Sequence, residues 1–126
     1  MKFTIDRQEK YTGITLEEEK LDTTLAPDMK SEVVKLHADG AGNLIMNMKN
    51  VKYTDSSGLS ALLVANRLFK EKGSFVLCEV QEHVMKLIKI SQLDKIMDIT
   101  NTEEEAVDLV FMNTLEQGFS EEESQS

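Results

Sequence analysis

The chain has 126 residues, which is enough for one domain with a single core and too few for two ordinary domains. Its 14 lysines and arginines are outnumbered by 23 aspartates and glutamates, and the resulting net charge of −9 would repel the phosphate backbone of nucleic acid. The longest apolar run, "ALLVA" at 61–65, is too short to span a membrane, and the amino terminus lacks the apolar core of a signal peptide. We therefore expect a cytoplasmic protein with no nucleic-acid partner and no membrane insertion.

The residue types that usually hold metals or cofactors are sparse. Cys78 is the only cysteine, so it cannot form an internal disulfide, and its place in the apolar run "FVLCEV" predicts a buried side chain. The two histidines, His37 and His83, fall in separate predicted helices without further ligands around them. We therefore expect no metal site and no cofactor.

Two short strands and a helix are predicted first along the chain. Residues 2–6 and 11–16 are β-branched or aromatic and are separated by the polar "RQEK", which indicates a hairpin. A helix is expected next, between Thr24 as its cap and Gly40 as its end, with a proline in its first turn. The short apolar run at 42–48 follows a glycine-containing turn and predicts a buried strand.

The alternation of strands and helices continues through the middle of the chain. Residues 57–72 have a helical pattern, with Asn66 on the polar side and an apolar face made of Ala61, Leu62, Ala65, Leu68 and Phe69. A strand at 74–80, a short amphipathic helix at 81–90 and a strand at 95–99 follow. Together these elements predict an α/β fold, a single small domain in which a mixed sheet of four to five strands is covered by about four helices.

A last helix is predicted from the capping box formed by Thr102 and Glu105. The apolar residues expected on its inward stripe are Ala106, Val107, Val110 and Leu115. The tail at 117–126 is acidic, rich in serine and poor in apolar residues, so it cannot bury enough surface to offset the entropy lost on ordering. We expect a folded domain over residues 1–116 followed by a disordered tail.

The polar seam of "YTDSSGLSALL" lies where a predicted strand gives way to a helix. Asp55 can accept hydrogen bonds from the first backbone amides of that helix, which leaves the Ser56 hydroxyl facing solvent. Ser57 can satisfy backbone groups in the turn, and Gly58 would let another chain come close. On this pattern alone, an ordinary helix cap is the simplest interpretation.

Several leucines follow the serines in the predicted helix. Leu59 and Leu63 lie on the flank of the helix away from the predicted core stripe, so they are candidate contacts for a partner protein.

A serine on a strand-to-helix turn is also typical of a hydrolase nucleophile elbow, but the Gly-x-Ser-x-Gly pattern is absent and no histidine is placed to act as a base. We therefore do not expect an enzyme.

The segment "DSSGLSALL", preceded by a strand, resembles the signature of the STAS domain family, which is named for sulphate transporters and anti-sigma factor antagonists. "KLDTTLAPDMKSEVVKL" is similar to the family's first helix, and "VQEHVMKLIKISQLDKIMDITNTEEEAVDLV" to its carboxyl half, so the resemblance covers residues 2–115. Lys20 departs from it, because many members have a glycine and an acidic residue before the pair matched by Leu21 and Asp22.

The resemblance implies an anti-sigma factor antagonist. Such a protein binds a serine-kinase anti-sigma factor while unphosphorylated and so frees a sigma factor; the kinase then phosphorylates the serine after the motif aspartate, here Ser56, and a PP2C-type phosphatase reverses this. The residues expected around the phosphorylation loop and partner contact are Asp55, Ser57, Gly58, Leu59, Leu63 and Asp22, although Asp22 also fits a solvated turn carboxylate. The alternative is a STAS scaffold or adaptor in a lipid-transport or stress-signalling complex, in which this serine is never phosphorylated.

Overall fold

The computed structural model describes the backbone of residues 1–125 and the side chains of residues 1–117. The strands are β1 (Phe3–Arg7), β2 (Thr12–Leu16), β3 (Lys20–Leu21), β4 (Leu44–Asn47), β5 (Tyr53–Thr54), β6 (Phe75–Cys78) and β7 (Asp98–Thr100). The helices are α1 (Ala26–Ala38), α2 (Ser56–Lys70), α3 (Glu82–Ile90) and α4 (Glu103–Gln125), with a 3₁₀ turn, η1 (Leu93–Lys95), after α3. No helix in this part of the chain is both long and apolar enough to cross a membrane.

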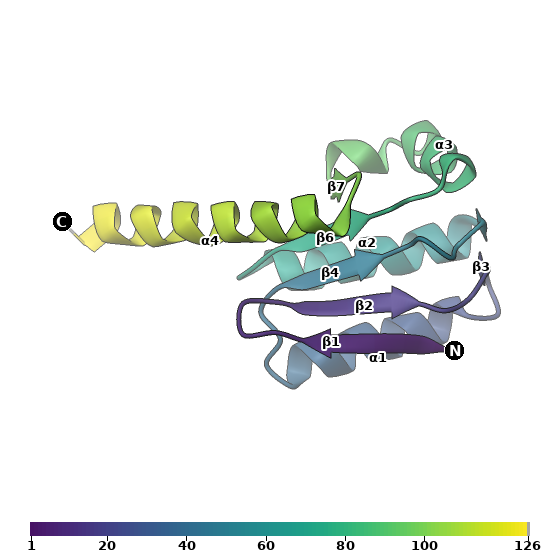
Figure 1. Cartoon of the computed structure of the whole chain (residues 1–126), viewed down its shortest axis with the longest axis horizontal. Helices are drawn as coiled ribbons and strands as arrows, with labels where there is room; N and C mark the ends of the chain where they lie inside the picture. Colours follow the sequence, from purple (N-terminus) through teal and green to yellow (C-terminus); the bar gives the residue numbers. More distant parts are fainter. Residues whose placement is uncertain (126) are drawn as a thin grey trace.

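The main sheet has five strands in the order β1-β2-β4-β6-β7 (Figure 1). The predicted hairpin forms its one antiparallel pair, β1 with β2, and the remaining strands run parallel to β2. Parallel neighbours need crossover connections, and α1, α2 and α3 provide them. The predicted α/β fold with a mixed sheet and four helices is therefore confirmed.

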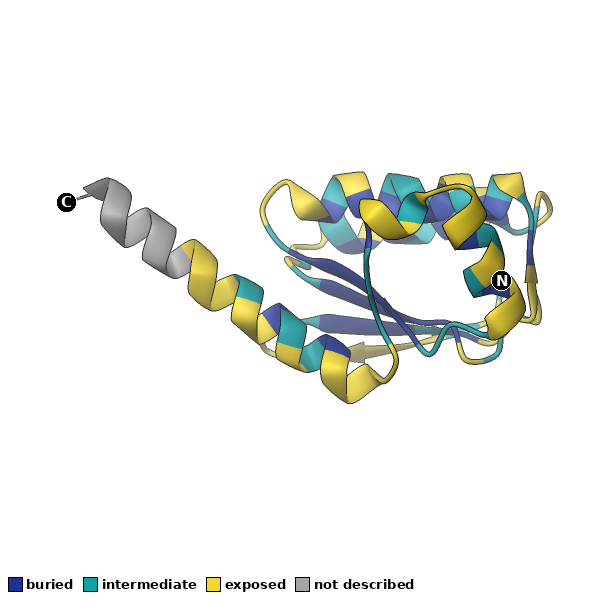
Figure 2. Cartoon of the chain, turned by 90° about the horizontal axis from the view of Figure 1, so that it is seen from above, coloured by how far each residue is buried: buried dark blue, intermediate teal, exposed yellow. Residues whose placement is uncertain are grey.

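Helices cover both faces of the sheet (Figure 2). On one face, α1, α2 and α3 enclose a large core whose bulkiest members are Phe69, Phe75, Ile14, Leu16, Leu21, Met29, Leu36, Leu44, Met46, Met48 and Leu62. On the other face, α4 places Ala106 and Val110 against Ile45, Val76 and Cys78. Every residue of β4 and of β6 is consequently buried, as is typical of central parallel strands.

Several details of the predicted elements are wrong. Thr24 does not cap α1, because the helix begins one residue later and its cap position, Leu25, makes no side-chain hydrogen bond. Asn66 is buried, since its amide donates to the Ile96 carbonyl where the 91–97 turn covers α2. The strand predicted at 95–99 is divided, with η1 at its start and β7 beginning only at Asp98.

The last helix, α4, begins as predicted and ends later. The Thr102 hydroxyl accepts a hydrogen bond from the Glu105 amide at 3.1 Å and donates to the Glu105 carboxylate, so the capping box is confirmed. Ala106 and Val110 face the sheet. Leu115 is exposed, since Asn113 already bonds to Ser74, just before the start of β6, and α4 runs past the ends of the strands. The backbone of α4 continues to Gln125; side chains beyond residue 117 lie outside the described residues, so the domain boundary at 116 stays a prediction.

A second, two-stranded sheet was not predicted. In it β3 and β5 pair in parallel, with Lys20 opposite Tyr53 and Leu21 opposite Thr54, and the Thr54 hydroxyl donates to the Leu21 carbonyl at 2.8 Å. Gly58, in the first turn of α2, lies so close that a methyl group there would overlap the Leu21 carbonyl oxygen and the Thr54 hydroxyl. The close approach expected at Gly58 is therefore made by this chain's own β3.

Replacing Gly58 with alanine should destabilise the fold. Because the overlapping atoms include backbone, β3 or α2 must shift, and overpacking of this kind costs about 1–3 kcal/mol. Gly42→Ala is the matched control, since an added methyl there meets nothing within 4 Å. Urea unfolding of both variants checks this, and equal free energies of unfolding for the two would contradict the close approach.

Candidate functional site

The β3–β5 pairing brings two loops together that are more than thirty positions apart in the chain. Asp55, the N-cap of α2, accepts a hydrogen bond from the Gly58 amide at 3.0 Å through Oδ1. Its other oxygen, Oδ2, accepts from both the amide and the hydroxyl of Thr23, each at 3.2 Å. Asp55 thus caps α2 as predicted and also ties it to the loop after β3.

The hydroxyl of Ser57 belongs to the same network. It lies 3.1 Å from the Thr23 hydroxyl oxygen. Thr23 has one hydroxyl proton, and where that proton is donated to Asp55, Ser57 must be the donor to Thr23. The Ser57 hydroxyl is therefore directed toward Thr23, and its hydrogen bond helps to hold the two loops together.

Ser56 differs from its neighbour in both exposure and bonding. It is exposed at the first position of α2, while Ser57 is half-buried. Within the described residues, its hydroxyl makes no hydrogen bond of the kind that holds Ser57. Of the two adjacent serines, Ser56 is thus the one whose oxygen an incoming enzyme can reach without breaking the loop.

The Asp55 carboxyl has a pKa below its ordinary value. The main cause is the hydrogen bond from the Gly58 amide, which stabilises the charged form; desolvation opposes it, and the bonds from Thr23 and from the Ser57 amide add to it. Asp55 is therefore ionised throughout the neutral range, and a fixed negative charge stands beside Ser56.

Asp22 lies next to this network without joining it. Its carboxylate accepts from the Thr24 amide at 3.0 Å, and its carbonyl accepts from the amides of Leu25 and Ala26. Asp22 thus shapes the turn into α1, and the contact with the serine loop is made by its neighbour Thr23. The sequence pattern did not single out Thr23, because its importance depends on Asp55, 32 positions away.

The two leucines expected to contact a partner are both half-buried. Leu59 packs against the edge of the main core, so part of its side chain already has a structural role. Leu63 lies one turn further along α2. Their use as partner contacts stays a prediction.

Neither histidine forms a hydrogen bond with Ser56 or Ser57 among the described residues. His37 packs edge-on against Phe69, and His83 stacks on Tyr53 with ring centroids 6.2 Å apart. No group of three histidine, cysteine or carboxylate side chains gathers in the described part of the chain. Cys78 is buried as predicted, and burial raises the pKa of its thiol to about 12.

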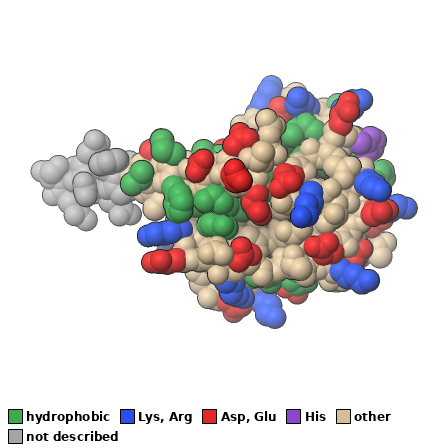
Figure 3. All heavy atoms as spheres, viewed as in Figure 1, with side chains coloured by type: hydrophobic (Ala, Val, Ile, Leu, Met, Phe, Trp, Pro, Cys, Tyr) green, Lys and Arg blue, Asp and Glu red, His purple; other side chains and the backbone are tan. Residues whose placement is uncertain are grey.

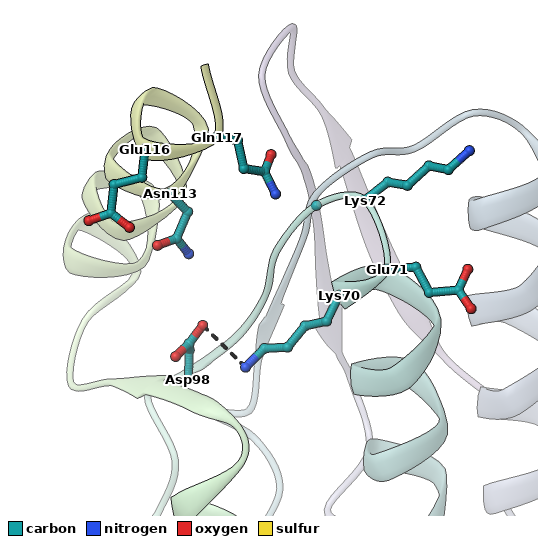
Figure 4. Close-up of a pocket in the computed structure, with 8 residues that line it drawn as sticks. Lys70, Glu71, Lys72, Asp98, Asn113, Glu116 and Gln117 are labelled. Carbon is teal, nitrogen blue, oxygen red and sulfur yellow. Dashed lines mark ion pairs between the residues drawn. The ribbon is translucent and has the colours of Figure 1, made fainter. Parts of the chain in front are cut away.

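A pocket of about 730 Å³ lies at a distance from the serines (Figure 4). It lies between the carboxyl end of α2 and α4, with Lys70, Lys72, Asn113 and Glu116 in its wall. Ser56 is at the opposite end of α2, about 20 Å away at 1.5 Å per residue. This pocket is therefore separate from the serine loop, beside which a second pocket, of about 560 Å³, is lined in part by Asp22, Thr24 and Leu25.

Comparison with known proteins agrees with this arrangement. The STAS domain family model matches residues 4–106. The anti-sigma F factor antagonist of Paenibacillus polymyxa is 32% identical over 84 residues, which cover 61% of this chain and 72% of that protein. The anti-sigma-B factor antagonist of Bacillus subtilis (strain 168) is 32% identical over 89 residues, which cover 70% of this chain and 81% of that protein.

The fold is shared with solved structures. The Bacillus cell fate determinant SpoIIAA in its phosphorylated form superposes with a TM-score of 0.65 at 25% identity, covering 86% of this chain and 99% of that chain. Because the family model spans most of the sequence, and because the sheet, the helices and the serine loop agree with it, this chain belongs to the STAS domain family.

Proposed function

We propose that this chain is an anti-sigma factor antagonist that binds a serine-kinase anti-sigma factor when unphosphorylated and thereby releases a sigma factor. Its relatives are named anti-sigma factor antagonists, and the observation that carries the proposal is the contrast between the two serines of the loop. The Ser56 hydroxyl is exposed, whereas the Ser57 hydroxyl is bonded to Thr23. Phosphorylation of Ser56 would end the complex, and a PP2C-type phosphatase would restore it.

The charge added by phosphorylation acts on binding more than on folding. A phosphate at Ser56 brings about −1.5 to −2 charges and three acceptor oxygens to an exposed position. Helix amino termini usually attract anions, but the Gly58 amide at this terminus already binds Asp55. The phosphate therefore meets an ionised carboxylate and stays at the surface, where it imposes a repulsion and desolvation penalty on a docked partner.

The role of this chain in the cycle is that of a substrate and binding partner. In the proposed cycle the chemistry of transfer and removal belongs to the kinase and the phosphatase. A scaffold or adaptor role without phosphorylation would use the same surface but would ignore the charge at Ser56. The same cycle places the protein in the cytoplasm.

Phosphorylation of Ser56 is tested by incubating the purified chain with ATP and serine-kinase anti-sigma factors from the same genome. Mass spectrometry should place the phosphate on Ser56, and Ser56→Ala should remain unmodified. Ser57→Ala, the matched control, should still be phosphorylated because its hydroxyl serves the loop. Phosphate found on Ser57 or on the tail serines alone would overturn the assignment.

Ser56→Asp should weaken binding to the anti-sigma factor. Placing a second carboxylate beside Asp55 should cost a few kcal/mol at the interface, which is about a hundredfold in Kd. Ser31→Asp, the same change at an exposed serine of α1, should leave Kd within about twofold. Calorimetric titration measures both variants, and an unchanged Kd for Ser56→Asp would favour the scaffold role.

Asp55→Asn should alter how stability depends on pH. Because folding lowers the pKa of Asp55, its stabilising contribution is complete above the pKa of an unfolded aspartate, about 4, and is lost as the pH falls through the folded value. The variant should therefore melt below the parent at pH 7 and approach it in acid. Asp94→Asn, at an exposed carboxylate of η1, is the control. A difference in melting temperature between Asp55→Asn and the parent that stays the same at every pH would contradict this account.

A further inference from the structure

The outward side of α4 is unusually apolar for a helix surface in contact with solvent. Beyond the buried Ala106 and Val110, its side chains Phe111, Met112 and Leu115 are 41%, 56% and 57% exposed. Figure 3 shows hydrophobic side chains gathered along α4 on this face, bordered by carboxylates. An apolar stripe on a helix that extends past its own sheet indicates a surface meant to be covered.

The charge on α4 is of one sign. Residues 103–117 contain five carboxylates, Glu103, Glu104, Glu105, Asp108 and Glu116, and no lysine, arginine or histidine. None of these carboxylates forms an ion pair within the described residues. The surface that covers the apolar stripe should therefore be apolar with basic residues at its rim.

Two surfaces of the described chain have those properties. One, on α1, has a single exposed apolar side chain, Val34, beside Lys30 and Lys35. The other, on α3, η1 and the neighbouring side of α2, has two. Ile90 and Ile96 are exposed there, by 78% and 50%. The basic side chains on this surface that are exposed and make no ion pair within the described structure are Arg67, Lys89 and Lys95. Arg67 belongs here because α2 is bonded to this turn, with Asn66 and Lys70 both donating to the Ile96 carbonyl.

The apolar stripe of α4 and the surface on α3 and η1 cannot meet within one molecule. Val84 and Ile88 hold α3 on the core formed with α1 and α2, whereas Ala106 and Val110 hold α4 on the opposite face of the sheet. An anchored α4 therefore cannot reach the α3–η1 surface of its own chain. A second copy of the chain can bring its own α3–η1 surface to α4.

We propose that α4 of one copy docks on the α3–η1 surface of a second copy, with Phe111 and Leu115 against Ile90 and Ile96 and with the carboxylates of α4 beside the lysines. The contact is head to tail, so the dimer retains one free α4 and one free α3–η1 surface, and longer assemblies can form. Pairing of α4 with another α4 would cover the same apolar residues but would bring like charges together. The proposal does not depend on phosphorylation of Ser56.

The apolar area on each side is small, so the association should be weak and dependent on concentration. Sedimentation velocity on the full chain, from about 10 µM to about 1 mM, should show association that is weakened about tenfold or more when salt rises from about 50 mM to about 500 mM. A sedimentation coefficient constant over this range would overturn the proposal. Association that strengthens with salt would overturn it in favour of α4–α4 pairing.

Two variants test the α4 side and the α3–η1 side of the contact separately. Phe111→Ser removes the apolar anchor on α4, and the double change Lys89→Glu with Lys95→Glu reverses the charge of the α3–η1 rim. Each alone should weaken association about tenfold or more, because each lacks one surface. Val34→Ser and Lys35→Glu, the same kinds of change at exposed positions of α1, should leave association within about twofold. Equal weakening by the α1 changes would overturn the assignment of the surfaces.

Mixing the two variants gives the sharpest result. The Lys89→Glu, Lys95→Glu chain keeps an intact α4, and the Phe111→Ser chain keeps an intact α3–η1 surface, so the mixture should form a dimer that neither chain forms alone. Pairing of α4 with α4 predicts the reverse, since the charge-reversed chain would then associate by itself and Phe111→Ser would not join it. Circular dichroism melting of each variant, expected to match the parent because all these positions are exposed, shows that the loss is not one of folding.

Discussion

The parallel pairing of β3 with β5, only two residues on each strand, is the contact on which the serine loop depends. The Thr54 hydroxyl holds the Leu21 carbonyl, and Gly58 lets α2 begin directly against that carbonyl. With these atoms in place, Thr23 lies beside Asp55. The Asp55 carboxylate can then accept hydrogen bonds from both the loop after β3 and the first turn of α2. A larger residue at position 58 would push β3 away from α2 and break these hydrogen bonds.

Three adjacent residues of this loop, Asp55, Ser56 and Ser57, differ in charge, exposure and hydrogen bonding. Asp55 keeps its charge because three residues, Gly58, Thr23 and Ser57, donate hydrogen bonds to it. The Ser57 hydroxyl in turn is bonded to Thr23. Ser56, between them, is left exposed. The proposed phosphorylation of Ser56 would therefore change the charge of the surface while the bonds that hold the loop remain unbroken.

The two faces of the main sheet differ in the size of the apolar core that they bury. The α1–α2–α3 side carries the large core and positions the serine loop at one end of α2, whereas the α4 side needs only a small apolar cluster to anchor a long helix. Because α4 runs past the ends of the strands, its exposed apolar side chains Phe111, Met112 and Leu115 are not covered by the sheet. The apolar stripe and the acidic charge of α4 are therefore available for contact with another molecule.

The sequence by itself determined the elements whose signals are local: the hairpin, the buried strands, the Asp55 cap and the capping box of α4. Hydrophobic period and capping act over a few residues, so they can be read along the chain. Only the tertiary structure decided the β3–β5 pair, the part of Thr23, the burial of Asn66 under Ile96 and the exposure of Leu115. Each of these depends on residues far apart in sequence, or on where the sheet ends, and such contacts exist only after the chain has packed.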